Sequence, residues 1–110
     1  MSLSITITSE PQGASVRSVV LVEGEVDVSN ADELRSQLSQ RLEAGDAEIV
    51  VDLATVPYID STGIGVLVGA AHRAADQGTR LSVARPQRNV ARVLGLLGVT
   101  DELNISDETR

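Results

Sequence analysis

Strand-like and helix-like segments alternate along this chain of 110 residues, and this alternation constrains its fold more than any other feature. Segment 16–23 contains the continuous apolar run V-V-L-V, which is typical of a strand that is covered on both faces. Segment 48–53, E-I-V-V-D-L, predicts a second buried strand. Between the two, apolar residues recur at helical spacing, at Ala31, Leu34, Leu38 and Leu42. This order predicts an α/β fold with parallel central strands and right-handed crossovers.

Five further segments complete a predicted order of β-β-α-β-α-β-α-β. Residues 4–9 alternate between polar and apolar and predict a half-buried edge strand. The others are a helix that follows Asp60 and ends near Gln77, a strand over 80–84, a helix over about 87–97, and a short last strand at Leu103 and Ile105. Because the first strand leaves one side wet, we expect a mixed sheet of four to five strands with helices mainly on one face. A chain of this length forms one domain, residues 1–110.

The same patterns predict the start of the first helix and the inward faces of the other two. Ser29 or Asn30 can be the N-cap, and Asn30 with Glu33 three residues later matches a variant of the capping box. The predicted inward face of the second helix consists of Ile64, Leu67, Val68, Ala71 and Ala75. That of the third helix consists of Val90, Val93, Leu94 and Leu97.

Composition excludes several classes of function. Nine basic against sixteen acidic residues give a net charge of −7, and the only aromatic residue is one Tyr, so we expect no direct nucleic-acid partner. The absence of Cys and the single His favour neither a metal site nor a catalytic triad, and no cofactor is predicted. The longest apolar stretch, 64–71, has 8 residues against the ~20 of a membrane span. With no targeting signal, we expect a cytoplasmic protein without a membrane partner.

The segment D-S-T-G at residues 60–63 places reactive groups where a helix begins. Asp60 contributes a carboxylate, and Ser61 and Thr62 contribute hydroxyls. The first turn of a helix has unpaired backbone N–H groups and the positive end of the helix dipole, so it stabilises an anion such as phosphate. A serine in a surface loop is also accessible to a kinase. The simplest alternative is that the two hydroxyls only cap the helix.

Catalytic and nucleotide-binding interpretations fit this region less well. The run G-I-G-V-L-V-G resembles a loose dinucleotide fingerprint, but Gly63 lies ten residues after Leu53 rather than in a tight turn next to a strand. Asp60 is a poor general base at neutral pH, and His72 lies twelve residues away. On the simplest interpretation, the glycines at 63, 65 and 69 let the helix approach the sheet closely.

Three segments together resemble the STAS domain family, and especially its bacterial anti-sigma factor antagonists. The most specific is V-D-L-A-T-V-P-Y-I-D-S-T-G-I-G-V-L-V, at 51–68. V-E-G-E-V-D-V-S-N-A-D-E-L resembles the loop that leads into the family's first helix, and R-V-L-G-L-L-G-V resembles its late helix. The resemblance covers essentially the whole chain in the right order.

The resemblance implies a binding switch without catalysis of its own. Family members, when unphosphorylated, bind a GHKL-type serine kinase that is also an anti-sigma factor, and thereby release a sigma factor for transcription. Phosphorylation of the serine after the Asp, here Ser61, ends this binding, and a PP2C-type phosphatase restores it. Asp27 matches the family's loop carboxylate beside the phosphorylation site. The residues that match its partner-facing surface are Asp60, Thr62, Gly63 and Ile64.

Two departures from the family concern the C-terminal part. Many members have a further C-terminal helix, which we expect to be short or missing here because only residues 106–110 follow the last apolar residue, and Leu94 stands where the family has an aromatic residue. Two other classes of function remain open. One is a non-phosphorylated STAS scaffold in a transport or stressosome-like assembly, although scaffolds often lack the serine. The other is a small enzyme or nucleotide-binding protein, which the lack of a His, Cys or Lys cluster disfavours.

Overall fold

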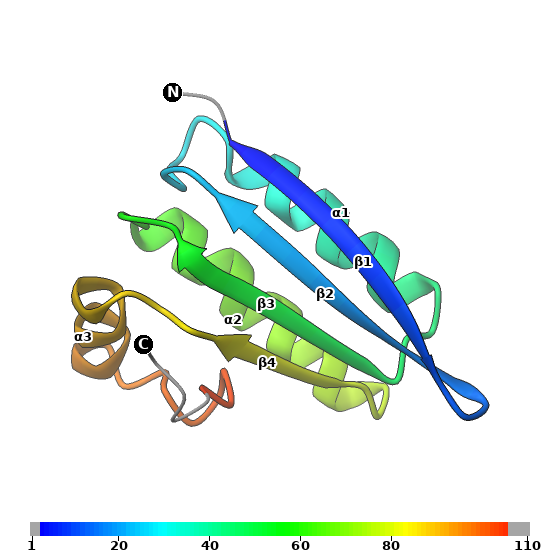
Figure 1. Ribbon diagram of the computed structural model, residues 1–110. Coiled ribbons are helices and arrows are strands. Elements are labelled where there is room, and N and C mark those ends of the chain that lie inside the picture. The colour runs from blue at the N-terminus through cyan, green and yellow to red at the C-terminus, as the bar shows by residue number, and fades with distance from the viewer. Residues whose placement is uncertain (1–2, 106–110) are drawn as a thin grey trace.

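The computed structural model describes residues 3–105, which form a four-stranded mixed sheet and three helices (Figure 1). The elements are β1 (Ser4–Gln12), β2 (Ser15–Glu23), α1 (Ala31–Glu43), β3 (Glu48–Thr55), α2 (Ser61–Asp76), β4 (Arg80–Ala84) and α3 (Arg88–Leu96). The strands lie in the order β1-β2-β3-β4; β1 pairs antiparallel with β2, and the other two pairs are parallel. The predicted α/β class and mixed sheet are confirmed.

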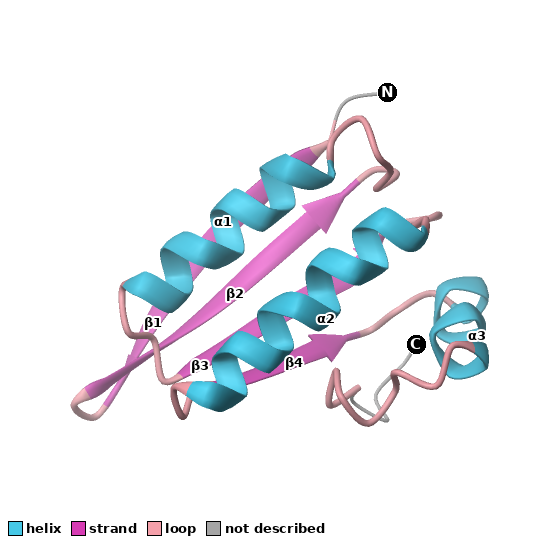
Figure 2. Ribbon diagram, turned by 180° about the vertical axis from the view of Figure 1, so that it is seen from behind, coloured by secondary structure: helices cyan, strands magenta, loops and turns pink. Residues whose placement is uncertain are grey.

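Helices α1 and α2 lie side by side on one face of the sheet, and α3 lies beyond the end of β4 (Figure 2). The core fills the space between this face and the two helices, because most of the alternate strand residues that point toward them are apolar. Its largest fully buried side chains include Leu34 and Leu38 from α1, Leu67 from α2, and Ile49 and Leu53 from β3. The helical stripe that the sequence predicts for α1 is therefore the buried face of that helix.

Among residues 3–105, no helix covers the other face of the sheet, which corrects the expectation that β2 is covered on both faces (Figures 1 and 2). Val19 and Leu21 point to this face and are only half-buried, whereas Val20 and Val22 are fully buried. Arg17 ends the apolar part of this face and pairs with carboxylates on both neighbouring strands, at 2.8 Å from Glu10 and 3.3 Å from Glu48. A continuous β-branched run therefore does not by itself indicate two covered faces.

Two predicted inward residues of α3 and one of α2 face solvent. In α3 only Val90 and Leu94 are buried, while Val93 is 40% and Leu97 is 55% exposed. Because α3 lies at the end of the sheet rather than across it, it buries one narrow stripe at i and i+4 spacing. In α2, Ala74 is buried and Ala75 is exposed, so the inward face is shifted by one residue at the end of the helix.

The prediction of a short last strand at Leu103 and Ile105 is also wrong. Leu103 is buried, but it lies in a turn, and its carbonyl accepts a hydrogen bond from Val83 N at 3.0 Å. Asn104 has a φ of 48°, which is incompatible with a strand, and its side chain donates to Leu81 O at 2.9 Å. This segment therefore closes the edge of β4 by single hydrogen bonds without becoming a fifth strand.

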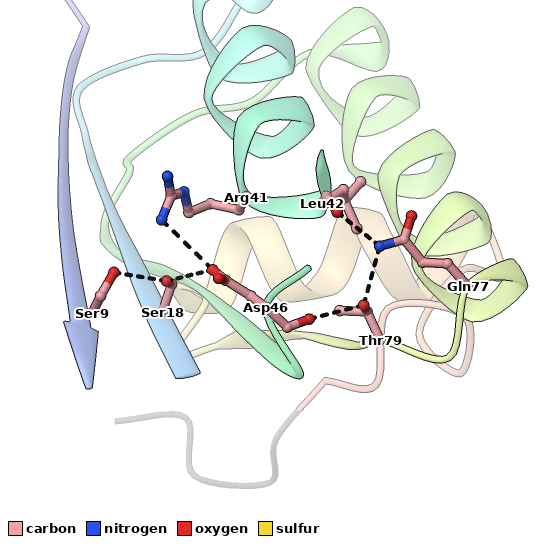
Figure 3. Close-up of polar contacts among 7 residues, drawn as sticks. All are labelled: Ser9, Ser18, Arg41, Leu42, Asp46, Gln77 and Thr79. Carbon is pink, nitrogen blue, oxygen red and sulfur yellow. Dashed lines mark hydrogen bonds and ion pairs between the residues drawn. The ribbon is translucent and has the colours of Figure 1, made fainter. Parts of the chain in front are cut away.

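Buried polar groups join the elements near the end of the sheet where β2, β3 and β4 begin (Figure 3). Asp46 is 4% exposed, and its Oδ2 accepts from the fully buried Ser18 Oγ at 2.6 Å. Ser9 Oγ lies 3.0 Å from Ser18 Oγ, and Thr79 Oγ1 donates to Asp46 O at 2.9 Å. Arg41 Nη1 approaches the same carboxylate at 3.8 Å. The cluster thus links β1, β2, α1 and the segments that enter β3 and β4.

Within residues 3–105, none of the helices has the length and apolar character that crossing a membrane requires.

Candidate functional site

Two loops meet at the opposite end of the sheet, where the parallel strands finish and the helices begin. The loop 24–30 joins β2 to α1, and the connector 56–60 joins β3 to α2. They continue the parallel pairing of the strands, because Val26 N donates to Tyr58 O at 3.0 Å and Asp60 N donates to Val26 O at 3.0 Å. The carboxyl ends of parallel strands share one edge of a sheet, which is why sites gather there. The pairing brings the loop of Asp27 against the connector of Asp60.

Asp60 holds this arrangement together with its side chain. It is the N-cap of α2, and its Oδ1 accepts from Gly63 N at 3.0 Å. Its Oδ2 accepts from Val28 N at 3.1 Å, which ties the start of α2 to the neighbouring loop. Both carboxylate oxygens are therefore engaged within the chain. The sequence predicts a cap from the hydroxyls as the simplest alternative, but the carboxylate before them is the capping group.

Gly63 allows α2 to begin this close to the two loops. A Cβ atom at position 63 would lie 2.6 Å from Val26 Cγ1 and 2.8 Å from Ile59 Cγ1. Gly65 and Gly69 differ, because a Cβ atom at either position would meet nothing within 4 Å. The expectation that all three glycines permit close approach to the sheet therefore holds only for Gly63.

The first turn of α2 divides into an exposed and a buried part. Ser61 and Thr62 are exposed, whereas Gly63 is buried and Ile64 is only 4% exposed. Ser61 lies at the first helical position, where the helix dipole and backbone N–H groups favour a negative charge. The side chain of Ile64 belongs to the core cluster, which corrects the expectation that it faces a partner.

Asp27 is engaged by its own loop rather than by Ser61. Its Oδ1 accepts from Ser29 N at 2.9 Å and from Ser29 Oγ. These hydrogen bonds, that from the Ser29 hydroxyl above all, hold the pKa of Asp27 below its ordinary value, so the group is ionised at neutral pH. Asp27 therefore contributes a fixed negative charge beside the connector.

Asn30 stabilises the loop from inside, which replaces the predicted capping box. Its side chain makes no cap hydrogen bond to α1. Instead, Oδ1 accepts from Asp27 N at 2.9 Å and Nδ2 donates to Glu25 O at 2.9 Å. The residue is 8% exposed, so the loop is closed around a satisfied amide.

Two exposed apolar side chains flank this site, and the sequence reasoning did not single them out. Val28 is 75% exposed in the loop, and Tyr58 is 50% exposed in the connector. The signals were an apolar residue within the polar segment D-V-S-N and the only aromatic residue of the chain. Exposed apolar groups around polar ones are typical of a protein-binding surface.

Comparison with known proteins places the chain in a family. Residues 8–110 match the STAS domain family, and the chain belongs to it. The chain is 36% identical over 87 residues to a Bacillus subtilis protein named anti-sigma-B factor antagonist, covering 79% of each sequence. It is 28% identical over 109 residues to the anti-sigma-B factor antagonist of Staphylococcus aureus, covering 99% of this chain and 97% of the relative.

Solved structures show the same fold. An anti-sigma factor antagonist from Mycobacterium paratuberculosis superposes with a TM-score of 0.78 at 23% identity, covering 94% of this chain and 86% of the other. The Bacillus cell fate determinant SpoIIAA in its phosphorylated form superposes with a TM-score of 0.68 at 18% identity, covering 94% and 93%. The arrangement of four strands and three helices is therefore that of the STAS fold.

Proposed function

We propose that the protein is an anti-sigma factor antagonist that acts as a phosphorylation-controlled binding switch and has no catalytic activity of its own. The observation that carries the proposal is the exposed Ser61 at the start of α2, with exposed Val28 and Tyr58 beside it. The family membership and the names of the relatives support it. When Ser61 is unmodified, this surface binds an anti-sigma factor and so frees a sigma factor for transcription.

Phosphorylation at Ser61 would act through charge rather than through a change of fold. A phosphate adds about −1.5 to −2 charges at neutral pH. The start of α2 stabilises that charge, and the Asp60 carboxylate that caps the helix already has its partners. The fixed charge of Asp27 lies on the neighbouring loop, so the phosphate would increase a local negative potential. A partner that buries Val28 and Tyr58 would then also have to desolvate the phosphate, which weakens binding.

The predicted site residues take distinct parts in this proposal. Thr62 is exposed next to Ser61 and contacts the partner directly. Asp60 and Gly63 keep the first turn of α2 against the loop of Asp27. Ile64 anchors that turn in the core. The proposed partners are a GHKL-type serine kinase that is also the anti-sigma factor and a PP2C-type phosphatase, all in the cytoplasm.

The test combines phosphorylation and binding measurements on matched variants. The anti-sigma factor kinase of the source organism is incubated with the protein and ATP, and the modified residue is mapped by mass spectrometry. We expect phosphate on Ser61, and none in Ser61→Ala, while Thr62→Ala, its exposed neighbour, is still modified. Calorimetry should show tight binding of the kinase by Ser61→Ala and at least about tenfold weaker binding by Ser61→Asp.

Phosphate on Thr62 alone, or equal affinity of Ser61→Ala and Ser61→Asp for the kinase, would contradict the proposal. If no residue of the protein is phosphorylated and the two variants bind the kinase equally, the protein is better described as a non-phosphorylated STAS scaffold.

A further inference from the structure

The outer face of α3 presents an apolar and basic surface. It consists of Arg88, Asn89, Arg92, Val93 and Leu96, which follow one another along the helix and line a shallow groove; we call it the α3 stripe. Leu96 is 77% and Val93 40% exposed, and Leu97 beyond the helix is 55% exposed. Neighbouring exposed large apolar side chains differ from the single ones scattered over most surfaces and are typical of an interaction site.

The fold itself does not need the α3 stripe. The opposite side of α3 supplies the packing contacts, since Val90 is 2% and Leu94 is 0% exposed. A helix that only had to close the end of the sheet would carry polar residues on its outer face. The apolar residues of the stripe therefore point to a partner.

The charge of the α3 stripe is opposite to that of the rest of the protein. The chain has a net charge of −7, yet α3 contains two arginines and no acidic residue. Arg85, just before the helix, is paired with Asp52 at 2.5 Å. Arg88 and Arg92, in contrast, take part in none of the ion pairs that residues 3–105 form. Two exposed guanidinium groups beside apolar side chains are complementary to an apolar surface that is bordered by carboxylates.

The α3 stripe is continuous with the site around Ser61. Asn89 Nδ2 donates to Pro57 O at 2.8 Å, so the stripe begins at the residue next to the exposed Tyr58. Gln87 Nε2 donates to Ala54 O at 3.0 Å, near the end of β3 and just before this connector. Both α3 and the start of α2 lie near the end of the sheet where β3 and β4 finish (Figure 1). One partner of ordinary size can therefore cover both.

We propose that the α3 stripe is the second half of the surface that binds the anti-sigma factor, and that the anti-sigma factor presents there an apolar patch bordered by acidic residues. This inference rests on the proposed function. A second copy of the chain fits less well, because symmetric pairing through α3 would bring like-charged arginines together. An anionic membrane also fits less well, since the helix has nine residues and the chain is strongly acidic.

The test measures binding of the purified anti-sigma factor to the unphosphorylated protein by calorimetry at two NaCl concentrations. The variants are Arg92→Glu and Leu96→Ser, both at exposed positions. The matched controls, Arg80→Glu and Val16→Ser, are exposed residues near the opposite end of the sheet. Far-UV circular dichroism and urea denaturation check that every variant is folded.

We expect the affinity for the anti-sigma factor to fall at least about tenfold in Arg92→Glu and in Leu96→Ser, and to change less than about twofold in the controls. Because Arg92 acts through charge, the affinity of Arg92→Glu should also depend less on salt than that of the wild-type protein.

Several results would overturn the inference. If Ser61→Asp abolishes binding but both α3 variants bind normally, the proposed function stands and the inference falls. If the wild-type protein binds no anti-sigma factor, both fall. If the protein dimerises in solution and Leu96→Ser abolishes the dimer, the α3 stripe binds a second copy of the chain. If the protein floats with phosphatidylglycerol vesicles and Arg92→Glu abolishes the flotation, the α3 stripe binds a membrane.

Discussion

Replacing Gly63 by Ala tests whether the close contact between α2 and the two loops determines stability. A Cβ atom there would lie 2.6 Å from Val26 and 2.8 Å from Ile59, which is closer than carbon atoms approach without displacement. Val26 is 0% and Ile59 is 5% exposed, so neither side chain can move outward into solvent. The added methyl group must therefore shift α2 or the paired loops.

The expected magnitude follows from two opposing effects. In a helix, Ala is more favourable than Gly by up to about 1 kcal/mol. Overpacking a well-packed region costs about 1–3 kcal/mol. Gly63→Ala should therefore lose about 1–2 kcal/mol of the free energy of unfolding. Gly69→Ala, on the same helix but with nothing within 4 Å, should gain about 0.5–1 kcal/mol.

Urea denaturation followed by far-UV circular dichroism measures both variants, and Tm provides a second measure. The two variants should differ in Tm by roughly 10 °C, since 1 kcal/mol corresponds to about 4 °C in a domain of this size. Adding Val26→Ala to Gly63→Ala removes one of the two clashes, so the double variant should lose less than the sum of the single losses. If Gly63→Ala is as stable as Gly69→Ala, the close approach does not constrain α2.

Two further predictions concern the hydrogen bonds of carboxylates. Ser18→Ala removes the hydroxyl that donates to the buried Asp46 carboxylate at 2.6 Å, and it should lower the free energy of unfolding by about 1–3 kcal/mol. Ser15→Ala, at an exposed position of the same strand, should change it little. Equal urea midpoints of the two variants would contradict this prediction. Ser29→Ala removes the hydroxyl that most lowers the pKa of Asp27, so the pKa measured by carboxyl NMR should rise toward 3.8. A carboxyl whose pKa is lowered by folding stabilises the protein above its unfolded pKa, and this stabilisation is lost as the pH falls through the folded pKa. The free energy of unfolding of Ser29→Ala should therefore fall less with acid below about pH 4 than that of the wild-type protein. An unchanged pKa of Asp27 in this variant would show that the Ser29 contact is not maintained in solution.

The architecture could be predicted from the sequence because it depends on periodicity. The apolar run at 19–22 indicated a strand, the stripe of α1 indicated its buried face, and alternating strands and helices leave few topologies. The predictions that were wrong depended on how much neighbouring surface an element packs against, which the sequence pattern does not show. Val93 and Leu97 have an inward spacing, but α3 lies at the end of the sheet and cannot bury them. Leu103 is buried as an apolar residue should be, yet the left-handed Asn104 keeps its segment out of the sheet.

The candidate site was located by sequence, but the contacts within it were not. D-S-T-G correctly indicated where α2 begins, because caps and helix ends are local features. The hydrogen bond from Val28 N to the Asp60 carboxylate could not be predicted, because it depends on the pairing of two loops and joins residues 32 positions apart. Asn30 occupies the predicted N-cap position of α1, but its side chain bonds to Asp27 and Glu25 in its own loop instead of capping the helix. Local patterns cannot reveal such partners.

The connector beside Ser61 also carries the only side chain that absorbs in the near ultraviolet. The chain has one Tyr and no Trp or Phe, so tyrosine fluorescence comes entirely from Tyr58, at 50% exposure. Far-UV circular dichroism, in contrast, averages over the whole backbone. Comparing the two signals during denaturation would show, without any label, whether this edge opens before the domain unfolds as a unit.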